Sequence, residues 1–347
     1  MDGLPQTFRL ETTDPTLADP SLTSPMLPSP VMAGFGFGMQ RTLRSAISCV
    51  GVGLHGGRRV ALTLRPAPAG SGFVVRRTDL IHADGSAGVD IPARFDHVID
   101  TRLCTVLGLP GHPEARVGTV EHVLAALAGC GVHNAVVEVD GPEMPILDGS
   151  SSDFVFLIDC AGTVEQDLPV EAIEVLRPVR VSHGESYAEL RPRANGFDMS
   201  VSIAFDATAI GWQALTLQLG PGVFRSRLAR ARTFTMASEV EHLRAAGLAL
   251  GGSLDNAVVV DGAAVLNPAG LRMPDEFVRH KLLDAVGDLA LAGAPLRGRY
   301  VAHRPGHALN NQLLRALFAD DANWRPAVPA ESIAGWQIRL PAAAAPA

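Results

Sequence analysis

The stretch GTVEHVLAALAG at residues 118–129, followed by NAVVEVDG at residues 134–141, decides the predicted fold. In the first segment apolar residues recur at helical spacing, and Gly129 stands where a glycine commonly ends a helix. The second segment is a short apolar run flanked by polar residues, which is typical of a buried strand. A helix that leads directly into a buried strand is therefore the expected building unit.

The same unit is expected again in the second half. There SEVEHLRAAG (238–247) predicts a helix, and NAVVVDG (256–262) predicts a strand that resembles NAVVEVDG. Two similar α+β halves follow from this, although the match is short and an origin by duplication stays open. The boundary is expected near 165–172, because AGTVEQDLP (161–169) is polar and rich in turn residues, so the predicted domains are 39–168 and 169–340.

Strand patterns surround these units. SCVGVGL (48–54) and RRVALTLRP (58–66) flank the turn-forming His55–Gly57 and predict a hairpin, and FVVRRTD (73–79) predicts a further strand. The stretch 175–206 predicts three strands, with turns at His183–Gly184 and Asn195–Gly196. A last helix is expected from about 275 to 291, between Pro274 and Gly293.

Both ends of the chain lack this patterning. Residues 1–38 are rich in Pro, Ser and Thr and are expected to be disordered, and residues 341–347 are expected to be a flexible tail. No secretory signal is predicted, because the first residues have no basic start followed by an apolar run. Met39 directly precedes the first patterned segment, so an over-extended start is one interpretation of residues 1–38.

Composition narrows the class of protein. The 347 residues are 47% hydrophobic and 19% charged, which allows a sizeable core, and the net charge of −7 argues against nucleic-acid binding. No apolar run approaches the roughly 20 residues that a membrane helix needs, so no membrane anchor is predicted. The four cysteines form no C-x-x-C pair, which excludes a thiolate zinc finger by spacing and favours a reducing compartment.

One polar stripe lies on the predicted helix 275–291. His280 and Asp284 are four residues apart and therefore share a face, which Asp288 continues by another turn. Val278, Leu282, Val286 and Leu289 gather on the opposite side. Such a stripe is either a solvated surface, the plainer interpretation, or part of a metal site.

Two further segments carry candidate chemistry. Glu121 and His122 are adjacent on a helix and point about 100° apart, so they cannot both hold one ion, but one can bind it while the other acts as a base. An ordinary charged helix surface is the alternative for this pair. His307 follows Arg304-Pro305-Gly306 and is interpreted either as an idle loop residue or as a general acid that a rigid turn presents.

Taken together these residues point to hydrolytic zinc. Two histidines and one carboxylate with an open fourth position are the recurring ligand set of such sites, and His122, His280 and Asp284 supply it. A zinc ion lowers the pKa of bound water toward ~7 and polarises a carbonyl group. Glu121 would accept the proton, while a cationic His307 would protonate the leaving amine or stabilise the oxyanion, with Lys281 adding positive charge.

With these motifs in place, the sequence from about Gln40 to Leu340 resembles the UDP-3-O-acyl-N-acetylglucosamine deacetylases of lipid A biosynthesis. The resemblance implies zinc-dependent hydrolysis of the acetamide of UDP-3-O-acyl-N-acetylglucosamine to UDP-3-O-acyl-glucosamine and acetate, the committed step of that pathway. The matching segments are Gly51–Gly57, Leu62–Pro68, Thr119–His122, Pro145–Ser150, Ala231–Phe234, Leu250–Ser253, Asp275–Lys281 with Asp284, and Gly306–Asn311.

The resemblance also implies a role for each residue. The zinc ligands fall on His122, His280 and Asp284, the general base on Glu121, and the cationic histidine on His307. Asp288 matches the carboxylate that orients this histidine, and Thr233 matches the oxyanion-stabilising threonine. The implied substrate-binding residues are Leu54, Phe234, Ser253, Lys281 and Arg304.

The fold and partners implied by the resemblance extend the prediction. Two α+β domains, each a layered sheet-and-helix sandwich, are expected to pack with their helices facing each other and the active site between them. An insert within 233–259 is expected to form an apolar passage for the acyl chain. One Zn²⁺ per chain is expected, with Fe²⁺ as an alternative, in a cytoplasmic monomer that binds an amphiphilic nucleotide sugar and no nucleic acid.

Two departures and two alternatives remain. Arg102 places a cation near the expected rim of the cleft, and Arg304-Pro305 replaces a Lys-Ser pair, which changes the expected hydrogen-bond geometry toward the diphosphate. The alternatives are a zinc amidohydrolase that acts on another acylated sugar, and a non-catalytic metal-binding homologue of the same fold.

Overall fold

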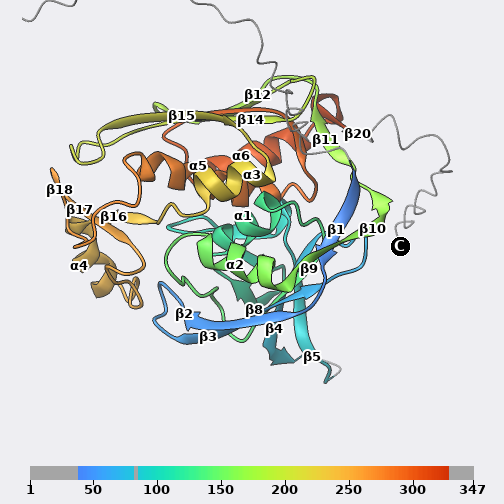
Figure 1. The fold of residues 1–347 in the computed structure, drawn as a ribbon, viewed down its shortest axis with the longest axis horizontal. Coiled ribbons are helices and arrows are strands. Elements are labelled where there is room, and N and C mark those ends of the chain that lie inside the picture. Colours follow the sequence, from blue (N-terminus) through green and yellow to red (C-terminus); the bar gives the residue numbers. More distant parts are fainter. Residues whose placement is uncertain (1–37, 82–84, 328–347) are drawn as a thin grey trace, which may run out of the picture. The chain divides into compact units, whose positions relative to one another are not determined.

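Two β-sheets enclose a layer of helices in the computed structural model, which describes residues 38–81 and 85–327 (Figure 1). This arrangement confirms the predicted α+β class. The predictions for the N-terminal segment, apart from Gly38, and for the tail 341–347 lie outside the described residues.

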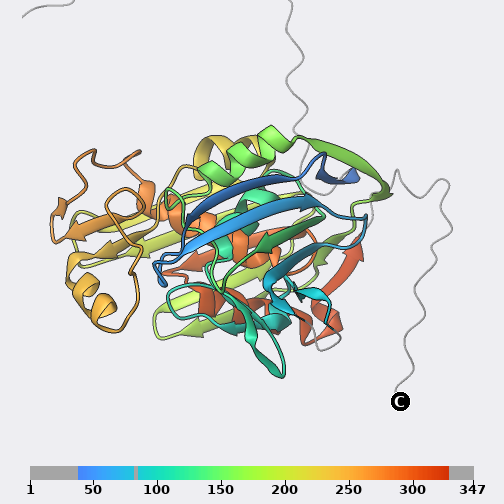
Figure 2. The ribbon, with the colours of Figure 1, turned by 90° about the horizontal axis from the view of Figure 1, so that it is seen from below.

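The first sheet has the order β2-β3-β9-β4-β5. Its strands are β2 (Ile47–Val52), β3 (Arg59–Pro66), β9 (Ala135–Val139), β4 (Phe73–Ile81) and β5 (Ala87–Pro92). β2 and β3 form the predicted antiparallel hairpin, and β9 is the strand expected from NAVVEVDG. β9 pairs antiparallel with β3 and parallel with β4, and Ala135 and Val137 on it are fully buried. Figure 2 shows this sheet from its outer side.

The second sheet repeats this plan as β12-β13-β19-β14-β15. Its strands are β12 (Val179–His183), β13 (Ser186–Arg191), β19 (Leu296–His303), β14 (Phe197–Ala204) and β15 (Trp212–Gln218), and β11 (Ala172–Val175) and β20 (Trp324–Ala327) extend it. Strand for strand the directions match those of the first sheet: β19 is antiparallel to β13 and parallel to β14. The two halves therefore share one topology, and β19 occupies the place of β9.

The likeness of NAVVVDG to NAVVEVDG within this chain pointed to the wrong strand as the equivalent of β9. NAVVVDG forms β17 (Val258–Asp261), which lies between β16 (Phe234–Met236) and β18 (Ala264–Val265) in a separate three-stranded sheet. Together with α4 (Ala237–Ala245) these strands form an insert at one end of the molecule (Figures 1 and 2). Alternation of short apolar residues suits any buried strand, so a seven-residue match does not identify equivalent positions. The prediction of two similar halves survives on topology instead.

The helices follow the same repeat. α1 (Glu121–Gly129) precedes β9 and α2 (Ser152–Ala161) follows it, as α5 (Glu276–Ala290) and α6 (His307–Phe318) flank β19. The expectation that the helix at 275–291 is the last one is therefore wrong. Pro305 and Gly306 suggested a loop, but α6 begins directly after them. No helix in the described ranges is long and apolar enough to span a membrane.

The expected boundary segment is ordered structure rather than a turn-rich linker. Residues 163–169 form β10 (Thr163–Pro169), which pairs antiparallel with β1 (Met39–Leu43). Its polar side chains suit a strand that is largely exposed. The division of the chain at residue 168 stays a prediction.

Shorter elements complete the chain. These are η1 (Phe95–His97), β6 (Val98–Asp100), β7 (Val106–Leu109), β8 (His112–Val117), α3 (Pro221–Val223), η2 (Phe224–Leu228) and η3 (Asp321–Asn323). η2 is a single π-helical turn, and its Phe224 ring packs on Gly129, where an added Cβ would lie 2.3 Å from the ring. The Phe224 ring therefore leaves room only for a glycine at 129, the last residue of α1. Gly131, with φ of +76°, makes the turn that Gly129 was expected to make.

α1 and α5 cross at very close range in the middle of the layer. α1 is buried on nearly all sides, as is α5, so neither has the solvated face of a surface helix. At the crossing, a Cβ on Gly287 would lie 2.0 Å from the carbonyl oxygen of Glu121. Only a glycine permits this approach, which brings the start of α1 against the last turns of α5.

We expect Gly287→Ala to lower the free energy of unfolding by about 3 kcal/mol, because the methyl group forces the two helix backbones apart. Gly222→Ala is the matched control, since Gly222 is also helical and has no atom within 4 Å of its added Cβ. Urea denaturation monitored by circular dichroism measures both variants. Equal stability of the two would contradict the close crossing.

Candidate active site

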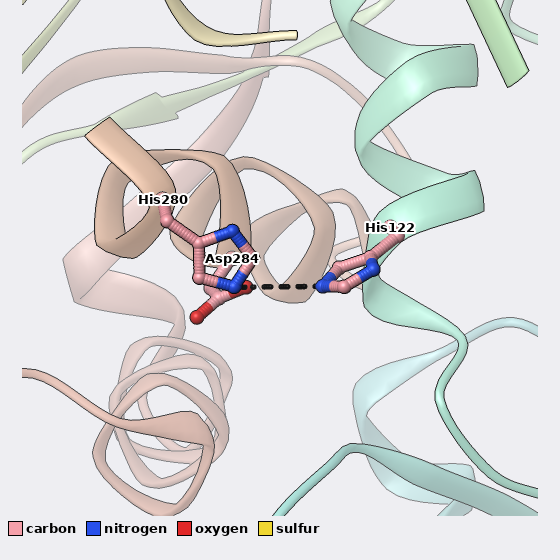
Figure 3. A group of neighbouring side chains, drawn as sticks. All are labelled: His122, His280 and Asp284. Atoms are coloured by element: carbon pink, nitrogen blue, oxygen red, sulfur yellow. Dashed lines mark ion pairs between the residues drawn. The ribbon is translucent and has the colours of Figure 1, made fainter. Parts of the chain in front are cut away.

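Three buried side chains meet where α1 and α5 cross. His122 comes from α1, and His280 and Asp284 come from successive turns of α5, as predicted from the sequence (Figure 3). The Oδ1 atom of Asp284 lies 3.2 Å from Nε2 of His280 and 3.6 Å from Nε2 of His122. One candidate ligand atom from each residue lies within 4.8 Å of the other two. The polar stripe on α5 therefore faces α1 and not water, and the solvated-surface interpretation is wrong.

These three residues fit a metal ion. Oδ1 of Asp284 is buried and has no hydrogen-bond partner among the described residues, which is costly unless a cation lies beside it. Nδ1 of His280 donates a hydrogen bond of 3.0 Å to the Ala231 carbonyl oxygen, so the fold leaves Nε2 free as a ligand atom. Two imidazoles and one carboxylate form a donor set that suits Zn²⁺.

The electrostatic environment favours the protonation states that bind a metal ion, a neutral imidazole and an ionised carboxylate. Burial, aided by His122 and Lys281, outweighs Asp284 and lowers the pKa of His280 to about 3, so its imidazole is neutral. Burial acts to raise the pKa of Asp284, but the cationic groups around it, of which Lys281 stays charged, hold this pKa well below its ordinary value. Lys281 donates a hydrogen bond of 2.9 Å to Oδ2 of Asp284, on the other side of the carboxylate from the histidines.

A second polar group lies beside the cluster. Oε1 of Glu121 is 3.8 Å from Nε2 of His307, and Nδ1 of His307 donates a hydrogen bond of 2.9 Å to Oδ2 of Asp288. Glu121 and His122 are neighbours on α1, but Glu121 points toward His307 and His122 points toward Asp284. Adjacent residues of a helix are expected to point in different directions in this way. His307 is the first residue of α6, so a helix start and not a loop presents it.

Glu121 and His307 face each other, and the pKa values of both are raised. Burial raises the pKa of Glu121, and the positive potential of His307 and His122 offsets this only in part. Burial would lower the pKa of His307, but the carboxylates of Asp288 and Glu121 outweigh it and raise this pKa to about 10. His307 is thus cationic at neutral pH, and Glu121 holds its proton more readily than an exposed carboxylate does.

The sequence analysis missed several residues that hold Glu121, Asp288 and His307 in place by hydrogen bonds. The backbone N–H of Thr105 donates to Oε2 of Glu121 at 3.0 Å, and its hydroxyl donates to Oδ1 of Asp288 at 2.6 Å. Asn310 donates to Oδ2 of Asp288 and accepts from the hydroxyl of Tyr300. Asn310 stands three residues after His307, so recognising α6 would have placed both on one face. No sequence signal marks Thr105.

A loop after β9 joins the two halves next to the ligands. Ser151 donates its hydroxyl to the carbonyl oxygen of His122, and its backbone N–H to the carbonyl oxygen of Ala229. The carbonyl oxygen of Gly149 accepts from the backbone N–H of Thr233 at 2.8 Å. A Cβ on Gly149, whose φ is +79°, would lie 1.9 Å from the carbonyl oxygen of Asn256, which explains the glycine in this motif.

A buried ion pair fixes the segment that holds His280. The guanidinium of Arg232 binds both carboxylate oxygens of Glu276, the first residue of α5, at 2.9 and 3.1 Å, and Glu276 is fully buried. Glu276 also accepts from the backbone N–H groups of Arg232 and Arg272. Because Arg232 lies between Ala231 and Thr233, this pair positions both beside the start of α5.

Two of the candidate substrate-binding residues adjoin the cluster. The Phe234 ring lies 6.2 Å from the ring of His280, and Nζ of Lys281 lies 5.4 Å from the Phe234 ring centre. Phe234 also contacts Phe277 and Phe205 edge-on, so it lies at the centre of a group of aromatic rings beside the ligands. Thr233 is half-buried, and its hydroxyl has no hydrogen-bond partner in the described part of the chain, so it is free to bind substrate.

The contacts of the other three candidates are with residues other than the ligands. Leu54 and Ser253 belong to two loops that touch each other, since the carbonyl oxygen of Leu54 accepts from Gly251, while Ser253 caps its own turn by accepting from Asp255. Arg304 is exposed, has φ of +48°, and lies 3.5 Å from Glu185. Arg102 is 88% exposed and paired with Asp100, so it does not approach the cluster.

Comparison with known proteins shows the family to which the chain belongs. Residues 40–319 match the family model of UDP-3-O-acyl N-acetylglycosamine deacetylase. The chain is 50% identical to the UDP-3-O-acyl-N-acetylglucosamine deacetylase of Idiomarina loihiensis over 287 residues. These aligned residues cover 82% of this chain and 91% of that protein. The enzyme of the same name from Myxococcus xanthus is 50% identical over 81% of this chain and 87% of its own length, and that from Acidithiobacillus ferrooxidans is 49% identical.

We expect Zn²⁺ added to the metal-free protein to raise Tm by roughly 5 °C, since an ion present at 100-fold its Kd stabilises the folded state by about 2.7 kcal/mol. His122→Ala should abolish this response, because it removes a ligand from the α1 side. His112→Ala, which changes an exposed histidine, should retain it. Differential scanning calorimetry provides the measurement, and an unchanged response in His122→Ala would disprove the site.

Proposed function

Because the chain belongs to the UDP-3-O-acyl-N-acetylglycosamine deacetylase family, a group of hydrolases that cleave an amide bond in lipid A biosynthesis, we propose that the buried cluster is its catalytic centre. In this proposal His122, His280 and Asp284 hold one Zn²⁺. The observation that carries it is the unpartnered, buried Oδ1 of Asp284 between two imidazoles, directly beside Glu121 and His307.

The proposed reaction begins at Glu121. A divalent ion held by the three ligands supplies Lewis acidity, which makes a water molecule easier to deprotonate and the acetamide carbonyl easier to attack. Glu121 accepts the proton of the attacking water, and its raised pKa suits a group that must hold a proton near neutral pH. The backbone N–H of Thr105 binds Oε2 of Glu121, which leaves Oε1 facing the site.

His307 serves the second half of the reaction. Its charged imidazole donates a hydrogen bond to Asp288 through Nδ1–H and presents its other N–H, on Nε2, toward the site. It can therefore stabilise the developing oxyanion and then protonate the leaving amine of the sugar. Thr233, with its free hydroxyl, is proposed as a second group at the oxyanion, and Asp288 as the residue that keeps His307 charged and oriented.

Substrate binding is proposed to begin at Phe234, the aromatic ring beside the ligands. Phe234 and Lys281 border the ligands, and the insert that begins at β16 is proposed to cover the acyl chain. Leu54 and Ser253 belong to the loops that join this insert to the β2–β3 turn, which supports a place for them at the wall of the cleft. Arg304 lies in the loop that leads to His307, so its proposed contact is with the outer, charged part of the substrate.

The partners and setting are part of the proposal. The enzyme is proposed to act as a monomer. Cys49, Cys104, Cys130 and Cys160 are all free, in keeping with a cytoplasmic enzyme. The ligand set could also hold Fe²⁺. The metal is proposed as Zn²⁺ because two imidazoles and one carboxylate are the usual ligands of zinc in hydrolytic sites.

The proposed function is tested by Glu121→Gln. We expect the turnover of UDP-3-O-acyl-N-acetylglucosamine to fall by about 10²–10⁴-fold, because the general base is lost while the zinc ligands remain. Metal analysis should still find one zinc per chain. Acetate release, followed by chromatography, measures the rate.

Glu189→Gln is the control for this test, because Glu189 is also a buried carboxylate but pairs with Arg191 and Arg180 on the second sheet. It should keep the turnover of the unaltered enzyme. Full activity of Glu121→Gln would show that Glu121 is not the general base. No acetate release by the unaltered enzyme would leave the chain as a metal-binding member of the family without this catalysis.

A second test concerns the acyl chain. We expect kcat/KM for UDP-3-O-acyl-N-acetylglucosamine to exceed that for UDP-N-acetylglucosamine by roughly 100-fold or more, since each buried methylene contributes about 0.8 kcal/mol. Initial rates with the two substrates measure the ratio. Equal values would exclude an apolar passage and favour an amidohydrolase with another acylated sugar as substrate.

A further inference from the structure

Thr105 is the one described residue that hydrogen-bonds to both carboxylates of the second polar group. It is 2% exposed and lies between β6 and β7 of the first half. Its backbone N–H donates to Glu121, and its hydroxyl donates to Asp288 across the interface between the halves. The bond to Asp288, at 2.6 Å, has the short length of a hydroxyl bound to a charged acceptor.

These contacts close a ring of four residues. Thr105 binds Glu121 and Asp288, Asp288 accepts from His307, and Nε2 of His307 lies 3.8 Å from Oε1 of Glu121. Glu121 and Asp288 belong to different helices, and the backbones of those helices touch at Gly287. Beyond this backbone contact, Thr105 is what fixes the two carboxylates relative to each other.

Asp288 depends on Thr105 for its orientation. Oδ2 of Asp288 accepts from His307 and Asn310, whereas Oδ1 accepts only from Thr105 among the described residues. The torsion that turns an aspartate carboxylate has broad minima, so hydrogen bonds and not a rotamer preference set its plane. Without the Thr105 hydroxyl, Oδ1 is unpartnered, and the carboxylate can rotate together with the imidazole that it holds.

The first half holds Thr105 itself in place. Its carbonyl oxygen accepts from the backbone N–H of Val120, the residue directly before α1. Leu103, two residues earlier, has φ of +67°, which turns the loop toward the helix start. The position of Thr105 is therefore set by α1, while its hydroxyl acts on α5.

We propose that Thr105 is a positioning residue for the deacetylation: its two donors fix the general base Glu121 and, through Asp288, the acid His307 in one geometry. This rests on the proposed function for the roles of Glu121 and His307. Thr105 itself touches neither metal nor substrate in this proposal.

Thr105→Val tests the hydroxyl while it keeps the shape and the backbone N–H. We expect kcat to fall by about 10- to 100-fold, with KM changed by less than about 3-fold and zinc content unchanged, as for other residues that orient a catalytic group. Thr105→Ser, which restores a hydroxyl, should recover most of the loss. An unchanged kcat in Thr105→Val would overturn the proposal.

Thr42→Val is the matched control for a merely structural effect. Thr42 is also a buried threonine of the first half, whose hydroxyl donates to the carbonyl oxygen of Asn134 and accepts from Ala67. Its loss should lower stability and leave kcat as it is. A similar fall in kcat for Thr42→Val and Thr105→Val would overturn the proposal, because stability alone would then explain both.

A double-mutant cycle tests whether Thr105 acts through Asp288. When Asp288 is already Ala, adding Thr105→Val should lower kcat by less than about 3-fold, since the group that Thr105 orients is gone. Independent, multiplied losses would overturn the proposal, because they would show that Thr105 affects turnover by another route.

The last measurement does not depend on turnover. The Nδ1–H proton of His307, assigned by its absence in His307→Gln, should give a slowly exchanging NMR signal that Thr105→Val shifts or broadens, whereas Thr42→Val leaves it unchanged. If the enzyme shows no deacetylase activity, the proposed function fails, and this signal still decides the positioning. An unaltered signal in Thr105→Val would overturn it.

Discussion

The close crossing of α1 and α5 is the constraint on which the rest of the site depends. Gly287 lets the α5 backbone touch the carbonyl oxygen of Glu121, and this contact sets the separation of every catalytic side chain on the two helices. His122 and Glu121 lie on one side of it, and His280, Asp284 and Asp288 on the other. A wider crossing would separate both the ligand set and the pair formed by Glu121 and His307.

Hydrogen bonds from outside the two helices add what the crossing alone does not supply. The Arg232–Glu276 pair and the Ala231 carbonyl fix His280 from the second half, while Ser151 binds the backbone of His122 from the first. Burying so many charged groups is unfavourable unless each is paired, and here nearly all are. In the cluster the exceptions are Nδ1 of His122 and Oδ1 of Asp284, and a cation would lie beside Oδ1 of Asp284.

Much of this could be predicted from the sequence, but not all. The patterns of β2, β3, β9 and α5 predicted their elements, because burial on a sheet or along a helix leaves a clear periodicity. The chemistry of His280 and Asp284 was less certain, since a stripe of polar residues looks the same whether it faces water or another buried helix. Only the resemblance to a family distinguished these two before the structure did.

What the sequence could not reveal has specific causes. NAVVVDG misled because short buried strands look alike, whereas true equivalence is a matter of pairing order, which no local pattern records. Thr105 was missed because its two hydrogen bonds reach residues 16 and 183 positions away. α6 was missed because Pro305 and Gly306 obscured a helix that begins at the next residue.

The shared topology of the two halves has a consequence for how such an enzyme can diversify. In each half a long connection leads from an edge strand of the sheet to the buried helix and carries the extra elements. The connection from β5 to α1 contains β6–β8, and the connection from β15 to α5 contains the insert with β16–β18. Both connections end where a helix presents its metal-binding residues. Evolution can therefore lengthen or rebuild these two segments to alter what is recognised, while the crossing helices and the reaction they support stay unchanged.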